Sequence, residues 1–361
     1  MSGAGAAAIA TMKTDAFQRR GLGALKWAAF GVACWVFWRA IAQADFGRVA
    51  ASVSAIGPVI AVVLLPFLVA MSFDVLGWRH LYAGLGRNIP FAPFLACRLA
   101  GEAILLSLPG GQVVAEPMAP YLLRERCGVP LAEGFAGLGL KKALFSIAHG
   151  ALIFGGAVIG WGALVRVSPL LVGGPWLPWA IAGIGFLVMA AFAGGVYALL
   201  RGSPARRLID ALAASPIAVL RRFADARRDA FVSTDRHLAA AWSGARVERA
   251  FALFMGFWLV EAAETWLILH LLGASLSFSE VMSFEAAVSL ARALAFFVPA
   301  GLGVQDLGYM AMLRALGVAD ATTVGAAFVM IKRVKELFWI AVGYVLLLAT
   351  RTPRGAVVAD T

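Results

Sequence analysis

Long apolar stretches divide most of the chain into segments of membrane-spanning length. Runs of about 20 apolar residues cross a hydrocarbon core, and such runs predict spanning helices at 22–43, 54–78, 134–160, 176–200, 250–272 and 321–349. Two further apolar segments, 91–126 and 279–316, are interrupted by Pro and Gly, in LPGGQ (108–112) and VPAGLG (298–303). Each half is short, which predicts two helical hairpins rather than two single spans.

The two interruptions limit what the hairpins can face. A break in a helix exposed to lipid would leave backbone groups without hydrogen bonds, at several kcal/mol each. Each break must therefore face protein or a water-filled cavity, and we predict two re-entrant hairpins. Glycines at these breaks would allow the backbone to approach a ligand closely.

The interrupted segment occurs twice in related form. PGGQVVAEPMAPYLLR (109–124) aligns with PAGLGVQDLGYMAMLR (299–314), which matches Glu116 with Asp306. The same offset matches Asp74 with Glu264. Further along, KALFSIAHG (142–150) aligns with KELFWIAVG (335–343), with six of nine residues identical. We predict an internal duplication, with repeat one at 54–160 and repeat two at 247–349.

The composition assigns these helices to a membrane. Of the 361 residues, 61% are hydrophobic and 14% are charged, whereas soluble proteins carry roughly 25% charged residues. This excludes a soluble globule and predicts an all-α polytopic membrane protein. The net charge of +11 would suggest nucleic-acid binding in a soluble protein. Basic cytoplasmic loops explain it in a membrane protein, so we expect no nucleic-acid partner.

The distribution of basic residues predicts the topology. It places an N-terminal tail (1–21), a basic loop (201–249) and a C-terminal tail (351–361) in the cytoplasm, around a transmembrane domain at 22–350 with an uncleaved first helix. The loop suits either an interfacial amphipathic segment on an anionic leaflet or a plain solvated loop. Counting crossings starts repeat one outside and repeat two inside. We therefore expect inverted-topology repeats, which are typical of alternating-access transporters.

Ionisable residues fall inside the predicted membrane segments, where each costs about 2.5–3.5 kcal/mol on insertion scales. Two explanations fit: buried ion pairs that hold the halves together, or a polar cavity of net positive character for an anionic head group. Arg98 and Glu102, four residues apart, could pair within one helix. The candidate substrate-binding residues are Arg98, Arg124, Lys142, Arg292, Arg333, Lys335, Gly111, Gly301, Gly303 and Gln305.

Glu116 and Asp306 follow the two breaks at matched positions. They are candidates to carry coupling protons. A second explanation fits equally well, because a carboxylate near the start of a helix also serves as a cap.

Sequence motifs of common enzymes are missing. The chain has no GxSxG, HExxH, Walker A or Rossmann fingerprint, and GLGVQDLG (301–308) lacks the spacing of the last of these. The three cysteines, Cys34, Cys97 and Cys127, have no CxxC spacing, so we predict neither a metal site nor a disulfide framework. We expect a protein that is not an enzyme and that needs no cofactor.

The block FVPAGLGVQD (297–306) resembles a signature of the lysylphosphatidylglycerol synthase transmembrane, or flippase-like, family. LPGG (108–111) and IKRVKELFW (331–339) fit the same family, and the resemblance covers residues 22–350. EAAETWLILHLLG (261–273) and Gln305 further resemble its hopanoid-biosynthesis-associated branch. The family implies a polytopic domain that moves lipid between leaflets. Its lysyl-transferring members carry a following aminoacyltransferase domain, which the sequence after residue 350 does not contain, so the resemblance argues against lipid lysylation here.

Together these features predict a multi-pass lipid translocase of the bacterial inner membrane. We expect its substrate to be a lipid with a polar or anionic head group, which the second resemblance relates to hopanoids, and its partners to be the bilayer and enzymes of lipid biosynthesis. Two alternatives stay open. One is a membrane-embedded lipid or lipid-linked-sugar transferase, for which Glu102 and Glu116 are the only hint of an acid/base pair, and the other is a scaffold of a lipid-synthesis complex.

The predicted topology can be tested with single cysteines at Ser233 and Ser275 in a background without native cysteines. Ser233 lies in the cytoplasmic loop and Ser275 in a short external loop. An impermeant thiol reagent added to intact spheroplasts should therefore label Ser275→Cys and not Ser233→Cys. Labelling of both positions from the same side would contradict the inverted arrangement.

Overall fold

The computed structural model describes residues 46–108, 111–201, 204–215, 221, 224–225, 244–294 and 304–349. Helices make up nearly all of these residues, and no strand occurs among them. The span expected at 22–43 lies outside the described residues, as do Gly301, Gly303 and most of the basic loop 201–249.

The first part of the chain contains a helical run that begins at α2 (Phe46–Ile56) and continues through the 3₁₀ helix η1 (Gly57–Val63) into α3 (Leu64–Gly84). The elements that follow are α4 (Phe91–Ser107), α5 (Gly111–Cys127), α6 (Leu131–Ile159), α7 (Trp161–Val172), α8 (Leu177–Arg201) and α9 (Pro204–Ala213). The later part contains α11 (Gly244–Leu271), α12 (Phe278–Leu294), α13 (Val304–Ala315) and α14 (Ala321–Ala349).

Helix length and apolar composition identify a multi-pass membrane protein. Four described helical stretches are long and apolar enough to cross a membrane: Val53–Gly84, Leu131–Ile159, Leu177–Tyr197 and Arg246–Leu271. They correspond to four of the predicted spans. Helix α14 also has 29 residues, with the bounds predicted for a span, but it carries charged residues near its middle. These are Lys332, Arg333, Lys335 and Glu336.

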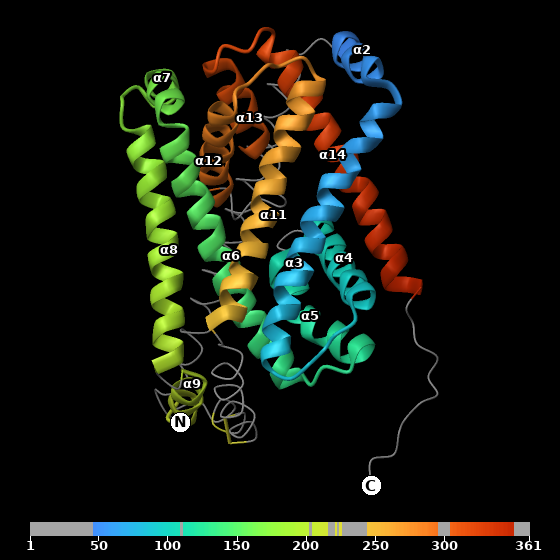
Figure 1. Cartoon of the computed structure of the whole chain (residues 1–361), viewed down its shortest axis with the longest axis vertical. Coiled ribbons are helices and arrows are strands. Elements are labelled where there is room, and N and C mark those ends of the chain that lie inside the picture. Colours follow the sequence, from blue (N-terminus) through green and yellow to red (C-terminus); the bar gives the residue numbers. More distant parts are fainter. Residues whose placement is uncertain are drawn as a thin grey trace, which may run out of the picture.

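Two pairs of shorter helices occupy opposite ends of the molecule (Figure 1). Helices α4 and α5 lie in the lower half, joined through Leu108, whose backbone is extended. Helices α12 and α13 lie in the upper half, and the segment that joins them is outside the described residues. Helices α4, α5 and α12 have 17 residues each. At 1.5 Å per residue each is about 25 Å long, which is shorter than the hydrocarbon core of about 30 Å.

The long helices run in alternating directions. In Figure 1, α3 descends from the upper end while α11 ascends beside it, and α6 ascends while α14 descends. Glycines allow α3 and α11 to approach closely, because a Cβ on Gly77 would lie 2.6 Å from the ring of Phe254 and a Cβ on Gly256 would lie 3.1 Å from the ring of Phe73.

The short helix pairs pack against long helices from the other half of the chain. Helix α4 meets α14 at Gly343, where an added Cβ would lie 2.5 Å from the carbonyl oxygen of Leu99. Helix α12 meets α6 at Gly156, where an added Cβ would lie 2.8 Å from the carbonyl oxygen of Met282. Backbone-to-backbone packing through glycine therefore holds each pair against a long helix.

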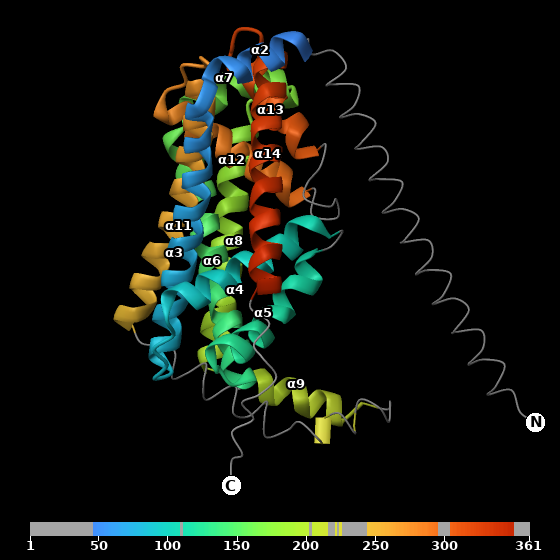
Figure 2. The same cartoon turned by 90° about the vertical axis from the view of Figure 1, so that its right-hand side faces the viewer.

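Polar contacts also join α5 to the end of α14. Arg126 Nη2 donates hydrogen bonds to the carbonyl oxygens of Leu346 and Leu347, at 3.4 and 3.2 Å. The last carbonyls of a helix have no partner within the helix, and a basic side chain near them also interacts favourably with the helix dipole. Figure 2 shows α9 lying across the lower end of the molecule, where Ile209 is buried.

Gly343→Ala should destabilise the protein, because the new methyl group would collide with the backbone of α4. Overpacking of this kind typically costs about 1–3 kcal/mol. Gly139→Ala in α6 is the matched control, since a Cβ there meets nothing within 4 Å and alanine is the better helix former. Thermal denaturation in detergent should show a lower midpoint for Gly343→Ala and an unchanged or higher midpoint for Gly139→Ala. Equal midpoints would show that the α4–α14 contact can relax without loss.

Candidate functional site

A fully buried carboxylate, Asp74 on α3, organises the first of two charged clusters. Its Oδ2 accepts a hydrogen bond from Arg98 Nε on α4 at 2.5 Å, and its Oδ1 lies 3.1 Å from Lys141 Nζ on α6. Arg98 Nη1 also donates to Glu102 Oε2 at 2.5 Å. Three helices are thus joined through one acid, and the expected pairing of Arg98 with Glu102 is confirmed.

Aromatic rings surround the lysine of this cluster. Lys141 Nζ lies 5.3 Å from the ring centre of Trp78 and 4.7 Å from that of Phe145. An ammonium group within about 6 Å of a ring centre is attracted to the negative face of the ring. The buried Lys141 ammonium group therefore has one carboxylate and two aromatic rings as partners.

A more exposed ion pair lies beside this cluster. Lys142 Nζ on α6 donates to Glu116 Oε1 on α5. The Lys142 side chain is 39% exposed and the Glu116 side chain is 32% exposed, whereas those of Arg98 and Lys141 are 14% and 7% exposed. This pair therefore lies at the edge of the cluster.

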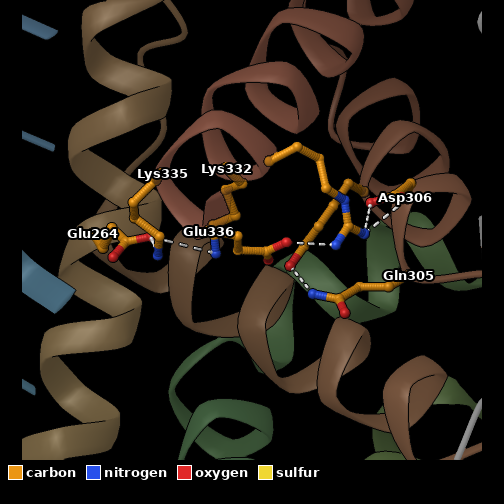
Figure 3. Close-up of polar contacts among 8 residues, drawn as sticks. Glu264, Gln305, Asp306, Lys332, Lys335 and Glu336 are labelled. Carbon is orange, nitrogen blue, oxygen red and sulfur yellow. Dashed lines mark hydrogen bonds and ion pairs between the residues drawn. The ribbon is translucent and has the colours of Figure 1, made fainter. Parts of the chain in front are cut away.

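The second charged cluster surrounds Glu264 on α11, which is also fully buried (Figure 3). Its Oε1 lies 2.5 Å from Lys335 Nζ and 3.8 Å from Lys332 Nζ, both on α14. The neighbouring Thr265 donates its hydroxyl to Glu285 Oε1 on α12 at 2.5 Å. Lys332 Nζ in turn donates to Thr265 Oγ1 at 3.4 Å, so α11, α12 and α14 share one hydrogen-bonded network.

Asp306 on α13 belongs to the same region (Figure 3). Arg333 Nη2 lies 2.8 and 3.0 Å from its two carboxylate oxygens, and Arg333 Nη1 donates to Glu336 Oε2 at 2.7 Å. Gln305, the residue before Asp306, donates its amide to the hydroxyl of Tyr309 one turn further along α13. Asp306 is buried, so its charge depends on Arg333 for compensation.

The two clusters have the same arrangement of acids and bases. In each, one acid lies on a long helix (Asp74 on α3, Glu264 on α11), and a second lies on the helix that follows a predicted break (Glu116 on α5, Asp306 on α13). Both acids in a cluster bind basic residues of one later helix, α6 in the first cluster and α14 in the second.

A pocket of about 50 Å³ borders the first cluster. Helices α3, α4, α5 and α6 enclose it, with apolar walls that include Trp78, Phe94 and Leu123. Its charged walls come from Arg98, Glu116, Lys141 and Lys142. The pocket thus combines apolar surface with fixed charges, as ligand sites commonly do. Its volume is well below the range of about 300–1,000 Å³ for pockets that enclose a whole ligand.

Comparison with known protein families adds the deciding observation. The family model described as the lysylphosphatidylglycerol synthase TM region matches residues 26–343, which include both clusters and the pocket. The chain belongs to the lysylphosphatidylglycerol synthase TM region family. This is a family of membrane domains of lipid-modifying proteins. No curated protein and no solved structure shows a significant match to the chain. The family match gives no support for a hopanoid-associated branch.

Within this family domain, the predicted site residues fall into separate regions. Arg98 and Lys142 line the pocket in the first cluster, and Arg333 and Lys335 belong to the second cluster. Arg124 is exposed near the end of α5. Arg292 lies on α12, where the position of its side chain is outside the described part of the structure.

Gly111 begins α5, and a Cβ there would collide with the carbonyl oxygen of Leu105 on α4. The absence of a side chain at this position therefore allows α5 to start against α4. The role predicted for Gly111, close approach to a ligand, stays a prediction.

Four residues at the centre of the clusters were not among the site residues predicted from the sequence. They are Asp74, Lys141, Glu264 and Lys332. A signal for the two acids was present, because Asp74 and Glu264 occupy matched positions in the proposed repeats. A buried carboxylate requires a buried cation, so the matched acids could have directed attention to the lysines nearby.

Removing a lysine should affect stability differently in the two clusters. Lys335→Ala would leave the fully buried Glu264 without its closest cation, and breaking a buried pair costs about 3–5 kcal/mol. Lys142→Ala removes one member of a partly exposed pair, for which about 0–1 kcal/mol is typical. Thermal denaturation in detergent should therefore show a clearly lower midpoint for Lys335→Ala and a small change for Lys142→Ala. Comparable losses in both variants would contradict the difference in burial.

Proposed function

We propose that this protein is a lipid translocase that moves a lipid with a polar or anionic head group between the leaflets of the bacterial inner membrane. One observation carries the proposal: in a membrane domain of a lipid-related family, charged side chains border a pocket between apolar helices. Ionisable residues in membrane helices usually face the protein interior and mark the path of a substrate or ion. A hopanoid-related substrate remains part of the proposal through sequence resemblance alone.

The proposed mechanism is alternating access between two inverted repeats. The opposite courses of α3 and α11, and of α6 and α14, support it, as do the two short helix pairs at opposite ends of the molecule. Under this proposal each pair is a re-entrant hairpin, and the pocket beside α4 and α5 takes the head group while the acyl chains stay in lipid. Arg98 and Lys142 would contact the head group first from this end.

Glu116 and Asp306 are proposed to couple translocation to protons. Each binds one basic side chain of a long helix, Lys142 on α6 and Arg333 on α14. Protonation of either acid would weaken its bond to the basic side chain. The contact between the two helices that carry the acid and the base would weaken with it, so uptake of a proton would change how these helices pack. A cap would not need to titrate, and asparagine ranks with aspartate in that role.

Translocation is favoured over the transferase and the scaffold by the positions of the carboxylates. A transferase would need an acid/base pair at the pocket, and of the two candidates Glu116 lines the pocket whereas Glu102 is bound to Arg98 and is not part of the lining. A scaffold would not need charged side chains around an interior pocket.

The test is lipid movement in proteoliposomes that contain the purified protein. Wild-type protein should transfer labelled lipid between leaflets faster than empty liposomes do and should leave the mass of the lipid unchanged. A change in lipid mass would favour the transferase, and the absence of both effects with a range of bacterial lipids would favour the scaffold.

The acids are tested in the same assay. Asp306→Asn and Glu116→Gln should keep the fold but lose the dependence of lipid movement on pH, because neither amide titrates. Arg166→Gln at the other end of the molecule is the control, since Arg166 is 66% exposed and pairs with Glu280 at 2.9 Å. Flux profiles like that of wild type in both acid variants would leave the two acids as structural residues.

A further inference from the structure

The charged groups around the hairpin pocket, defined as the pocket enclosed by α3–α6, balance one another. Three cations are present, on Arg98, Lys141 and Lys142, and the acids bound to them are Asp74, Glu102 and Glu116. Three positive and three negative charges cancel over the group as a whole, and Glu116 is the one acid of the three that lines the pocket itself. A purely anionic head group would have to displace an acid and then lie beside it.

Among these ion pairs, only that between Lys142 and Glu116 can separate at low cost. Asp74 is fully buried, and Arg98, Glu102 and Lys141 are at most 14% exposed. Separating them would leave a buried charge without compensation, which is strongly unfavourable. Lys142 and Glu116 are joined by a single contact between side chains that are 39% and 32% exposed, and such pairs contribute little to stability.

Opening this pair would create two adjacent sites of opposite charge. The Lys142 ammonium group would bind a phosphate, and the Glu116 carboxylate would bind a protonated amine. Both residues line the pocket, so the two new contacts would form at the same place.

We infer that the hairpin pocket binds a zwitterionic lipid head group that carries a phosphate and a primary amine, with the phosphate on Lys142 and the amine on Glu116. This rests on the proposed function and narrows its substrate class. The ligand replaces both partners of the ion pair at once, so that neither Lys142 nor Glu116 is left without compensation. A head group with only one of the two charges would leave one partner unpaired.

The apolar wall explains why the ligand is a lipid. Trp78, Phe94 and Leu123 line the pocket together with Leu105 and Leu138. Leu108, next to the end of α4, is 40% exposed and so offers apolar surface beside the helix pair. A head group held by the ion pair would therefore have an apolar surface against which the first carbons of the lipid can pack.

The test is a calorimetric titration of the purified full chain in detergent with short-chain phosphatidylethanolamine and phosphatidylglycerol of the same chain length. Wild-type protein should bind the ethanolamine lipid about fivefold more tightly, the ratio expected from one added contact of the strength of a partly exposed ion pair. Equal affinities, or tighter binding of phosphatidylglycerol, would overturn the inference. Soluble phosphoethanolamine should bind more weakly than the lipid, and equal affinity would overturn the assignment to a lipid.

Two variants should change the selectivity in opposite directions. Glu116→Gln leaves Lys142 unpaired and should reverse the preference toward phosphatidylglycerol. Lys142→Gln keeps Glu116 but removes the contact with the phosphate, so this variant should bind phosphatidylglycerol more weakly than wild-type protein does. Arg166→Gln, which removes a cation from an exposed pair far from the pocket, should keep the wild-type ratio. Unchanged selectivity in both pocket variants would overturn the assignment to this pair.

Failure of this inference and failure of the proposed function give different results. Lipid movement in proteoliposomes without head-group selectivity in the titration would remove the inference and keep the translocase. Selective binding without any movement of lipid would keep the binding site and remove the translocase. If a pocket variant does not fold, the ratio measured for wild-type protein still decides the inference.

Discussion

Burial of charge is the constraint on which the rest of this structure depends. Charged side chains in apolar helices are tolerated only where a partner of opposite charge lies within reach. Asp74 and Glu264 are both fully buried, and each draws basic side chains from another helix toward it. The positions of α6 and α14 relative to α3 and α11 are therefore fixed by ion pairs, in addition to the close helix contacts at glycine.

The two clusters differ in how far they are open to their surroundings. In the second cluster Glu264, Lys332 and Lys335 are each less than 10% exposed, and Asp306 is buried against Arg333. In the first, Lys142 and Glu116 are each about one-third exposed and border a pocket. A shared arrangement of acids and bases thus occurs once in an open form and once in a closed form. A domain whose two halves exchange these forms would present its charged groups to one side of the membrane at a time, as the proposed mechanism requires.

Much of the helical pattern could be predicted from the sequence, because helices in a membrane must be long and apolar. The bounds predicted for the last span, 321–349, are those of α14, and the break predicted at 108–112 separates α4 from α5. The pairing of Arg98 with Glu102 follows from spacing on one helix. The bond between Glu264 and Lys335 does not, since these residues are 71 positions apart and meet only when α11 packs near α14. Sequence could name the charged residues but not their partners, because partner choice is decided by packing.

The contact between Arg126 and the end of α14 has a consequence for how the protein is made. Arg126 leaves the ribosome about 220 residues before the carbonyl groups that it binds, on Leu346 and Leu347. The final turn of α14 is therefore completed by a side chain from a helix synthesised long before it. Until α14 is inserted, the guanidinium group of Arg126 has to be accommodated elsewhere, by water, by lipid head groups or by a membrane chaperone. The contact between α5 and the end of α14 can therefore form only after α14 has been synthesised.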